Sequence, residues 1–274
     1  MLFSSVTPAS DSDLRNAIRV LRSQAQALDN LSGTSAADRL ASYQAWASQA
    51  SEVLRSAFDL VDVETLINTQ RHDFLLDISQ ADAQLLINTA VSAEKADRSK
   101  VFRSVLDGLE SMQACCDQLP DYLVVPDTNV FLHQEAYFDE LDWDELAGVS
   151  ANLRVMLPMA VVREIDKGKR AQAGKKVSDS NDQPVRSRAR QTSKRLREMF
   201  PYVDVVKVLS NRTSVELLLD PVGHKHLEDA DSEIIERAMA LKTVSRKEVY
   251  IATGDGHMQF MAKVAGLKVV AFPD

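Results

Sequence analysis

The chain has 274 residues, of which 45% are hydrophobic, so it can bury a sizeable core and has room for one large domain or two ordinary ones. The first residues lack a basic region followed by an apolar run, and no segment approaches the roughly 20 apolar residues of a membrane-spanning helix. These features exclude a disordered tail and argue against a membrane partner, and we expect a cytoplasmic protein.

The net charge of −8 argues against a protein that coats nucleic acid without selectivity, because such proteins usually carry a basic excess. The charge is unevenly distributed along the chain, however. Residues 163–198 contain 12 basic and 5 acidic side chains, whereas residues 1–120 contain 10 basic and 16 acidic ones. The basic charge is therefore concentrated in one tract.

The first 120 residues predict long helices, because Gly and Pro are absent from residues 35–107. Apolar residues recur at helical spacing from Leu14 to Leu28, behind capping residues at 11–13, and from Leu40 to Phe58, behind residues 33–35. Similar patterns cover residues 74–87 and 101–112. We therefore expect four or five helices in an all-α bundle, a domain over residues 1–120 that serves protein-partner binding, homo-oligomerisation or substrate gating.

Cysteine and tryptophan add little functional information. The two cysteines are the neighbours Cys115 and Cys116, which exclude a disulfide framework and a cysteine-based zinc site. We expect both thiols to be buried. Trp46 and Trp143 lie in helical patterns and are expected in the core rather than stacked on bases.

After Pro120, short β-branched runs alternate with helical patterns, which predicts a parallel sheet flanked by helices in a second domain over residues 121–274. The expected strands are residues 122–125, 154–157, 202–206, 249–253 and 267–272. The expected helices are residues 139–149, 159–167, 184–200, 229–241 and 258–265. Residues 168–182 are polar and lack periodicity, so we expect a mobile surface loop there.

Four acidic residues fall where the carboxyl edge of this sheet should lie. Asp127 follows the first strand, Glu164 lies on the helix after the second, Asp231 opens a later helix, and Asp255 closes the strand before the last helix. Taken alone, each of them is better explained as a helix cap or a solvated side chain. Four converging carboxylates, however, repel one another unless a cation neutralises them. The cluster therefore indicates a divalent ion, and oxygen ligands favour Mg²⁺ or Mn²⁺ over Zn²⁺.

The acids lie in four segments: VVPDTNVFLH, LPMAVVREIDKGKR, DADSEII and VYIATGDGHMQFMAKVAGLKVVAF. In their order and intervals these segments resemble the motifs of the PIN-domain nucleases, and the resemblance covers residues 121–274. It implies a PIN-like α/β fold and a metal-dependent endoribonuclease, a hydrolase that leaves 5′-phosphate and 3′-hydroxyl ends. Single-stranded RNA is the favoured substrate.

The resemblance assigns Asp127, Glu164, Asp231 and Asp255 as catalytic carboxylates. We expect Asp127 and Asp255 to ligate the principal ion, whereas Glu164 and Asp231 orient water, act as base or hold a second ion.

Further positions accompany the four acids. Asp229 remains an alternative metal ligand, because acidic residues alternate from 229 to 233, although Asp231 has its aliphatic partner at the expected offset. Thr128, Asn129 and Thr253 match accessory polar positions of the family, and we expect them near the substrate. Whether one or two ions bind stays open.

The helix expected at residues 184–200 carries an apolar stripe on one face and a basic stripe on another. The basic side chains are Arg186, Arg190, Lys194 and Arg197, and the apolar ones are Val185, Ala189, Leu196 and Phe200. A solvated surface explains the basic stripe equally well. Its position after Glu164 nevertheless favours contact with the phosphate backbone.

The histidines point less clearly to function. His257 follows Asp255 by two residues and is expected near the substrate, whereas His224 and His226 could bind a metal but are expected on the surface.

Two alternatives to a ribonuclease remain. The same fold could act on DNA or structured nucleic acid, because phosphate contacts do not distinguish the sugars. It could also be an inactive RNA-binding or scaffold protein, although the presence of all four acids counts against this.

Overall fold

The computed structural model describes residues 6, 8, 9, 12–78, 84–170, 184–221 and 223–272, so most of the loop expected at residues 168–182 lies outside the described residues. The chain divides into two compact units, with the division between Cys115 and Cys116. The domain boundary at residue 120 stays a prediction. In the described residues, no helix has the length and apolar character needed to cross a membrane.

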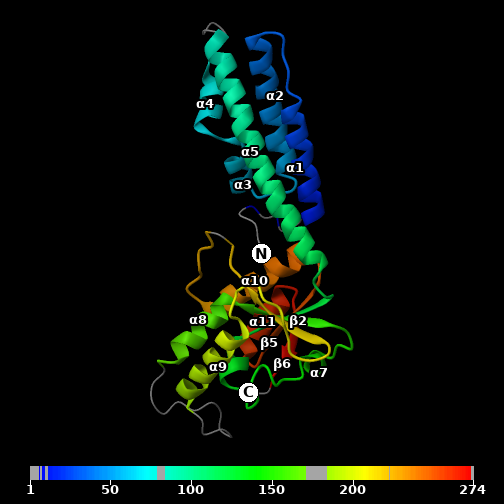
Figure 1. The fold of residues 1–274 in the computed structure, drawn as a ribbon, viewed down its shortest axis with the longest axis vertical. Helices are drawn as coiled ribbons and strands as arrows, with labels where there is room; N and C mark the ends of the chain where they lie inside the picture. Colours follow the sequence, from blue (N-terminus) through cyan, green and yellow to red (C-terminus); the bar gives the residue numbers. More distant parts are fainter. Residues whose placement is uncertain are drawn as a thin grey trace. The chain divides into compact units, whose positions relative to one another are not determined.

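The first unit is helical, as expected, and its five described helices are shown in blue to green in Figure 1. They are α1 (Leu14–Asp29), α2 (Ala36–Leu54), α3 (Leu60–Ile67), α4 (Gln70–Asp77) and α5 (Gln84–Asp117). The stretch at residues 101–112, expected as a separate helix, belongs to the long α5. Trp46 is buried as predicted, and its indole nitrogen donates to the carbonyl of Gln24 at 3.2 Å. Cys116 is buried, but Cys115 is partly exposed, so the prediction for that thiol was wrong.

The second unit contains a mixed, mostly parallel sheet of six strands in the order β3-β4-β2-β1-β5-β6 (Figure 1). The strands are β1 (Tyr122–Pro126), β2 (Leu153–Pro158), β3 (Lys207–Val208), β4 (Thr213–Leu218), β5 (Glu248–Thr253) and β6 (Lys268–Ala271). Every neighbouring pair is parallel except β3 and β4, which are antiparallel. The predicted α/β sheet is confirmed, with one antiparallel strand at its edge.

Helices flank this sheet: α6 (Thr128–Leu132), α7 (Trp143–Ala147), α8 (Met159–Gly168), α9 (Val185–Met199), α10 (Ala230–Ser245) and α11 (Gly256–Val264). Helix α8 contacts β2, α10 contacts β5, and α11 contacts both β5 and β6. Helices α8 and α9 lie side by side in Figure 1, and α9 also packs against α6. The basic tract of the sequence therefore includes the second half of α8 and nearly all of α9, and α9 packs against both α8 and α6.

The chain leaves β1 in one direction along the sheet, to β2 and then β4, and returns on the other side of β1 to form β5 and β6. The carboxyl ends of β1 and β5 thus meet at a topological switch point, where open α/β sheets place their ligand sites. Asp127 directly follows β1, and Asp255 lies two residues after β5. The topology therefore places both acids at this edge.

Two predicted elements of the second unit were wrong. Residues 202–206 do not form a strand, because Tyr202 and Val203 lie in a turn with exposed side chains. On the side of β2 away from β1, the sheet continues with β4 and then β3, neither of which the sequence analysis predicts. The helix predicted at residues 139–149 is limited to α7, which ends at Gly148 in the left-handed conformation with φ of 64°. Trp143 in α7 is buried, as predicted.

Candidate active site

Asp127 occupies the most constrained position of the four predicted acids. Residues 123–125 of β1 are fully buried, because β1 lies between β2 and β5. The backbone nitrogen of Asp127 donates to the carbonyl of Ala252 at 2.9 Å, so pairing with β5 continues up to the acid. Its side chain is only 2% exposed, and burial raises its pKa above the ordinary value despite the hydrogen bond from Thr253. A buried carboxylate held in this way has a fixed orientation.

Thr253 joins the acids at the ends of β1 and β5. Its hydroxyl donates to Oδ2 of Asp127 at 2.8 Å and accepts from the backbone nitrogen of Asp255 at 3.0 Å. Asp255 in turn caps α11, because its Oδ1 accepts from the backbone nitrogen of Met258 at 3.0 Å. The predicted site residues Asp127, Thr253 and Asp255 are thus connected by hydrogen bonds.

Glu164 is brought to the same edge by Thr128. The Thr128 hydroxyl, in the first turn of α6 directly after Asp127, donates to Oε2 of Glu164 on α8 at 2.8 Å. Thr128 and Thr253 are buried, with exposures of 6% and 0%. Because both side chains are buried, they are better suited to positioning the carboxylates than to the substrate contact that the sequence analysis expects. Asn129 is half-buried beside them.

The three alternating acids at the start of α10 have different environments. Asp229 caps the helix by accepting from the backbone nitrogen of Ser232 at 2.9 Å, and hydrogen bonds from Ser232 lower its pKa. Glu233 is 1% exposed and pairs with Arg163 at 2.5 Å. Asp231 lies between them in the sequence, is half-buried, and is close enough to Asp127, Asp255 and Glu164 for their charges to act on it. The geometry therefore favours Asp231 over Asp229 as the site residue.

Asp231 carries the clearest electrostatic sign that the acids converge. Burial and the negative charges of neighbouring carboxylates raise its pKa from 3.8 to about 6. The contributing carboxylates are those of Asp127, Asp229, Asp255 and Glu164. Acidic residues from four separate segments are therefore close enough to influence one another electrostatically.

The raised pKa of Asp231 predicts a pH-dependent stability in the metal-free protein. The folded state binds a proton between pH 3.8 and about 6 that the unfolded state has released, so stability falls as pH rises through this window and stays low above it. In EDTA, Asp231→Asn should therefore raise the melting temperature by a few degrees at pH 7.5 and leave it unchanged below pH 4.

Thermal melts of wild type and variant across this pH range measure the effect. Glu236→Gln, at an exposed position of the same helix, is the matched control and should change little at either pH. A gain for Asp231→Asn that is equal at both pH values would contradict the electrostatic explanation.

The basic helix α9 has a buried apolar face and an exposed basic face, as the sequence predicts, except that Phe200 follows the last helical residue and is partly exposed. Val185, Ala189 and Leu196 are buried, whereas the basic side chains of the predicted stripe are exposed. These exposed side chains are Arg186, Arg190, Lys194 and Arg197. Helix α9 packs against α6, which directly follows Asp127, and against α8, which carries Glu164. The exposed basic stripe therefore belongs to a helix that contacts two of the elements that position the acids.

Arg188 on the same helix was missed by the sequence analysis. It is 1% exposed, and its guanidinium donates to the carbonyls of Phe131 at 3.2 Å, Glu135 at 3.3 Å and Ala136 at 2.5 Å. It also lies 3.6 Å from the ring centroid of Tyr137. Arg188 thus holds the segment that follows α6 in place. It has a structural role, unlike the exposed basic side chains at neighbouring positions of α9.

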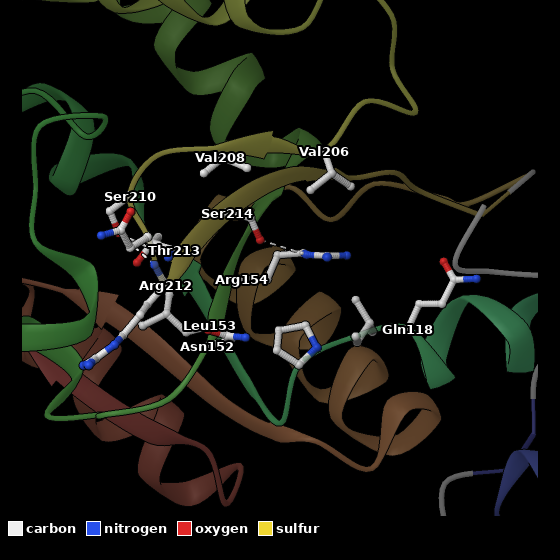
Figure 2. Close-up of a pocket in the computed structure, with 13 residues that line it drawn as sticks. Gln118, Asn152, Leu153, Arg154, Val206, Val208, Ser210, Arg212, Thr213 and Ser214 are labelled. Carbon is white, nitrogen blue, oxygen red and sulfur yellow. Dashed lines mark hydrogen bonds between the residues drawn. The ribbon is translucent and has the colours of Figure 1, made fainter.

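A cavity of about 410 Å³ lies at the opposite edge of the sheet, by the amino ends of β1, β2 and β4 (Figure 2). Its lining includes Leu119, Asn152, Arg154 and Arg212, but none of the four predicted acids. Arg154 is already paired with Glu216 at 2.9 Å. The cavity is therefore separate from the acidic edge.

The histidines differ from one another in exposure. His257 is exposed and lies close enough to Asp229 to influence that carboxylate, whereas its expected position near the substrate stays a prediction. The side chain of His224 is only 10% exposed, so the prediction of a surface position was wrong for this residue. His226 is 49% exposed.

The six-stranded sheet with its acidic edge defines the second unit as a PIN-like α/β domain. The family model of the PIN domain matches residues 124–272, and the chain belongs to this family. PIN domains are generally nucleases and typically use divalent metal ions. A search of curated proteins gives no match.

Proposed function

We propose that the protein is a metal-dependent endoribonuclease that hydrolyses single-stranded RNA at the edge formed by Asp127, Glu164, Asp231 and Asp255. The observation that carries this proposal is the set of hydrogen bonds through which Thr253 joins Asp127 to Asp255 and Thr128 holds Glu164 at the switch point of the sheet. The raised pKa of Asp231 supports the convergence of the acids. Membership of a nuclease family supports the same reaction class.

The donor set of the acidic edge fits a hard divalent cation. Carboxylate oxygens are the ligands that Mg²⁺ and Mn²⁺ prefer. The acids repel one another, and a bound cation would offset this repulsion. We assign Asp127 and Asp255 as the principal ligands and Glu164 and Asp231 as further ligands. Asp229 is an alternative ligand to Asp231. When bound, the ion supplies a lowered pKa of water and neutralises charge on the phosphoryl oxygens.

The chain's own residues hold this chemistry in place. Thr253 fixes the orientation of Asp127, and Thr128 fixes that of Glu164, through the hydrogen bonds described above. Asp231 is our candidate to orient the attacking water or to accept its proton, because it lies in the first turn of α10 among the other acids. Asn129, the half-buried residue of this group, is our candidate for a contact with substrate.

Incubation of purified protein with labelled single-stranded RNA and DNA of the same sequence tests the proposal. We expect cleavage of RNA with Mn²⁺ or Mg²⁺ and none with EDTA. Cleavage of DNA alone would move the assignment to the DNA-directed alternative. Metal-independent RNA binding without cleavage would favour the scaffold alternative.

We further propose that α9 guides the RNA backbone towards the acids. Replacing Arg186, Arg190 and Lys194 together with Ala should weaken RNA binding and leave the rate of cleavage of bound RNA unchanged. Each phosphate that no longer pairs with a basic side chain should reduce the slope of log affinity against log salt by about 0.7 for a single strand. The three substitutions should therefore flatten the slope by about 2 units, measured by titration of labelled RNA with Ca²⁺ in place of the active ion.

The matched control removes the same number of charges from exposed positions of the helical unit, Arg19, Arg55 and Lys100. It should leave the slope almost unchanged. If the α9 variant binds RNA as wild type does, the exposed basic face of α9 is only a solvated surface. The search for the RNA path would then move to Lys167, Lys169 and Arg170.

We also propose that the N-terminal helices bind a protein partner, form a homo-oligomer or gate the substrate, and that the protein is cytoplasmic.

A further inference from the structure

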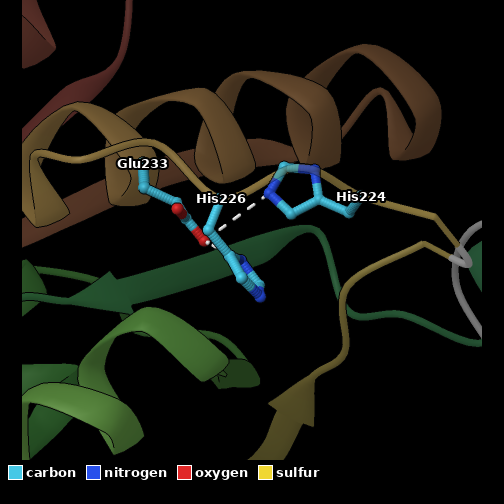
Figure 3. Close-up of side chains that lie close together, drawn as sticks. All are labelled: His224, His226 and Glu233. Carbon is cyan, nitrogen blue, oxygen red and sulfur yellow. Dashed lines mark hydrogen bonds and ion pairs between the residues drawn. The ribbon is translucent and has the colours of Figure 1, made fainter.

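A second group of metal-binding side chains lies outside the acidic edge. Among the described residues, His224, His226 and Glu233 each offer a ligand atom, and these atoms all lie within 4.8 Å of one another. The histidines come from the loop before α10, whereas Glu233 comes from the helix itself. Figure 3 shows both imidazole rings beside the Glu233 carboxylate. None of the three belongs to the site proposed above.

The distances in this group approach those of a tetrahedral zinc site. Oε1 of Glu233 lies 3.0 Å from Nδ1 of His226 and 3.5 Å from Nε2 of His224. Ligand atoms about 2.0 Å from a tetrahedral Zn²⁺ ion are about 3.3 Å apart. A small adjustment of side chains would therefore accommodate the ion, and two imidazoles with one carboxylate form a donor set that suits Zn²⁺.

A buried nitrogen that makes no hydrogen bond to a described residue is a second observation that points to a ligand. The His224 side chain is nine-tenths buried, and its Nε2 atom is buried without a hydrogen-bond partner in the described part of the chain. A buried polar atom without a partner is costly, so it calls for an explanation. In Figure 3 the dashed line joins this ring to Glu233, so the nitrogen is directed into the group.

Arg163 occupies part of this site in the structure. Its NH2 group pairs with Oε1 of Glu233 at 2.5 Å, and its NH1 group lies 3.3 Å from Nε2 of His226. Because arginine only donates, His226 accepts at Nε2 and carries its proton on Nδ1, the nitrogen that faces Glu233. Arg163 therefore blocks metal binding twice, by neutralising Glu233 and by keeping Nδ1 protonated. Asp220 offers it another partner, since NH1 lies 3.4 Å from Oδ2 of that residue.

We propose that His224, His226 and Glu233 form a transition-metal site for Zn²⁺, distinct from the acidic edge, at which the ion competes with Arg163. The fourth ligand is water, which reaches the site on the side of His226, the most exposed of the three side chains. A bound ion links the loop before α10 to the helix that carries Asp231.

Binding of Zn²⁺ to the full-length protein, measured by equilibrium dialysis with Mg²⁺ in large excess, tests the proposal. We expect one equivalent to bind. His226→Gln, at a half-exposed position that tolerates substitution, should weaken binding by more than about 100-fold, since loss of outer-shell partners alone typically costs 10- to 100-fold. Arg163→Met should do the opposite and tighten binding at least tenfold, because the competing cation is gone.

Two controls separate this site from the acidic edge. Asp127→Asn and His257→Ala should bind Zn²⁺ as wild type does. Co²⁺ in place of Zn²⁺ should give the intense visible absorption of a four-coordinate ion in wild type but not in His226→Gln. Zn²⁺ binding that is lost in Asp127→Asn, unchanged in His226→Gln, or absent from both wild type and Arg163→Met would overturn the proposal.

Discussion

Asp127→Asn should reduce the rate of RNA cleavage by about three orders of magnitude or more while the protein stays folded. Asp127 is the most buried of the four acids, and the substitution removes its charge with little change in shape. The Thr253 hydroxyl can still donate to the amide oxygen of the new side chain. Because burial and Glu164 disfavour the charge of Asp127, the metal-free variant should be at least as stable as wild type.

Single-turnover cleavage of labelled RNA with Mn²⁺ measures this loss, and circular dichroism verifies the fold. Asp121→Asn is the matched control, since Asp121 precedes the same strand at the opposite edge of the sheet and is 81% exposed. It should cleave at the wild-type rate. A well-folded Asp127→Asn variant with full activity would remove Asp127 from the catalytic centre.

Arg188→Ala should give the largest loss of stability, about 3–5 kcal/mol in the free energy of unfolding. The guanidinium is buried and donates to three carbonyls of the segment that follows α6. Its removal leaves these acceptors without their donor, each at a cost of about 1–3 kcal/mol where water cannot replace it. It also leaves a cavity against Tyr137.

Urea unfolding in a Trp46→Phe background measures this effect in the second unit, because Trp143 is then the remaining tryptophan. Arg190→Ala provides the control at an exposed position of the same helix, with an expected change within about 0.5 kcal/mol. Equal unfolding midpoints for the two variants would show that Arg188 does not anchor this segment.

The sequence predicts the central strands well because their burial leaves a direct record in the residues. In β1 and β5 almost every side chain is apolar, since neighbours cover both faces of the sheet. Strand β4 was missed because it alternates buried Thr213 and Val215 with the polar Ser214 and Glu216. The run at residues 202–206 has more β-branched side chains, but it forms no pairing with the sheet, and β-propensity alone does not provide one.

In the candidate site, too, some features could be predicted from the sequence and others could not. Asp127, Asp231 and Asp255 could be proposed from the sequence because each one follows a strand or lies at the start of a helix, a position that chain order reveals. Glu164 lies in the middle of α8 and was proposed from its motif. The burial of Arg188 and His224 could not be predicted in this way, because both side chains depend on contacts with segments distant in the sequence or on the path of a loop. A basic stripe and a pair of histidines look alike in sequence whether they are solvated or buried. Only the packing of α9 and the position of Glu233 distinguish them.

The central claim is that the acidic edge directs water to a phosphodiester bond, and the ends of the products test it most directly. Attack by water with departure of the 3′ oxygen leaves a 5′-phosphate and a 3′-hydroxyl, whereas attack by the 2′-hydroxyl of the RNA leaves a 2′,3′-cyclic phosphate. Mass spectrometry of fragments from a defined single-stranded RNA, cleaved with Mn²⁺, distinguishes these products. We predict 5′-phosphate and 3′-hydroxyl ends that are absent with Asp127→Asn. Cyclic phosphate ends, or the same fragments from Asp127→Asn, would contradict the assignment.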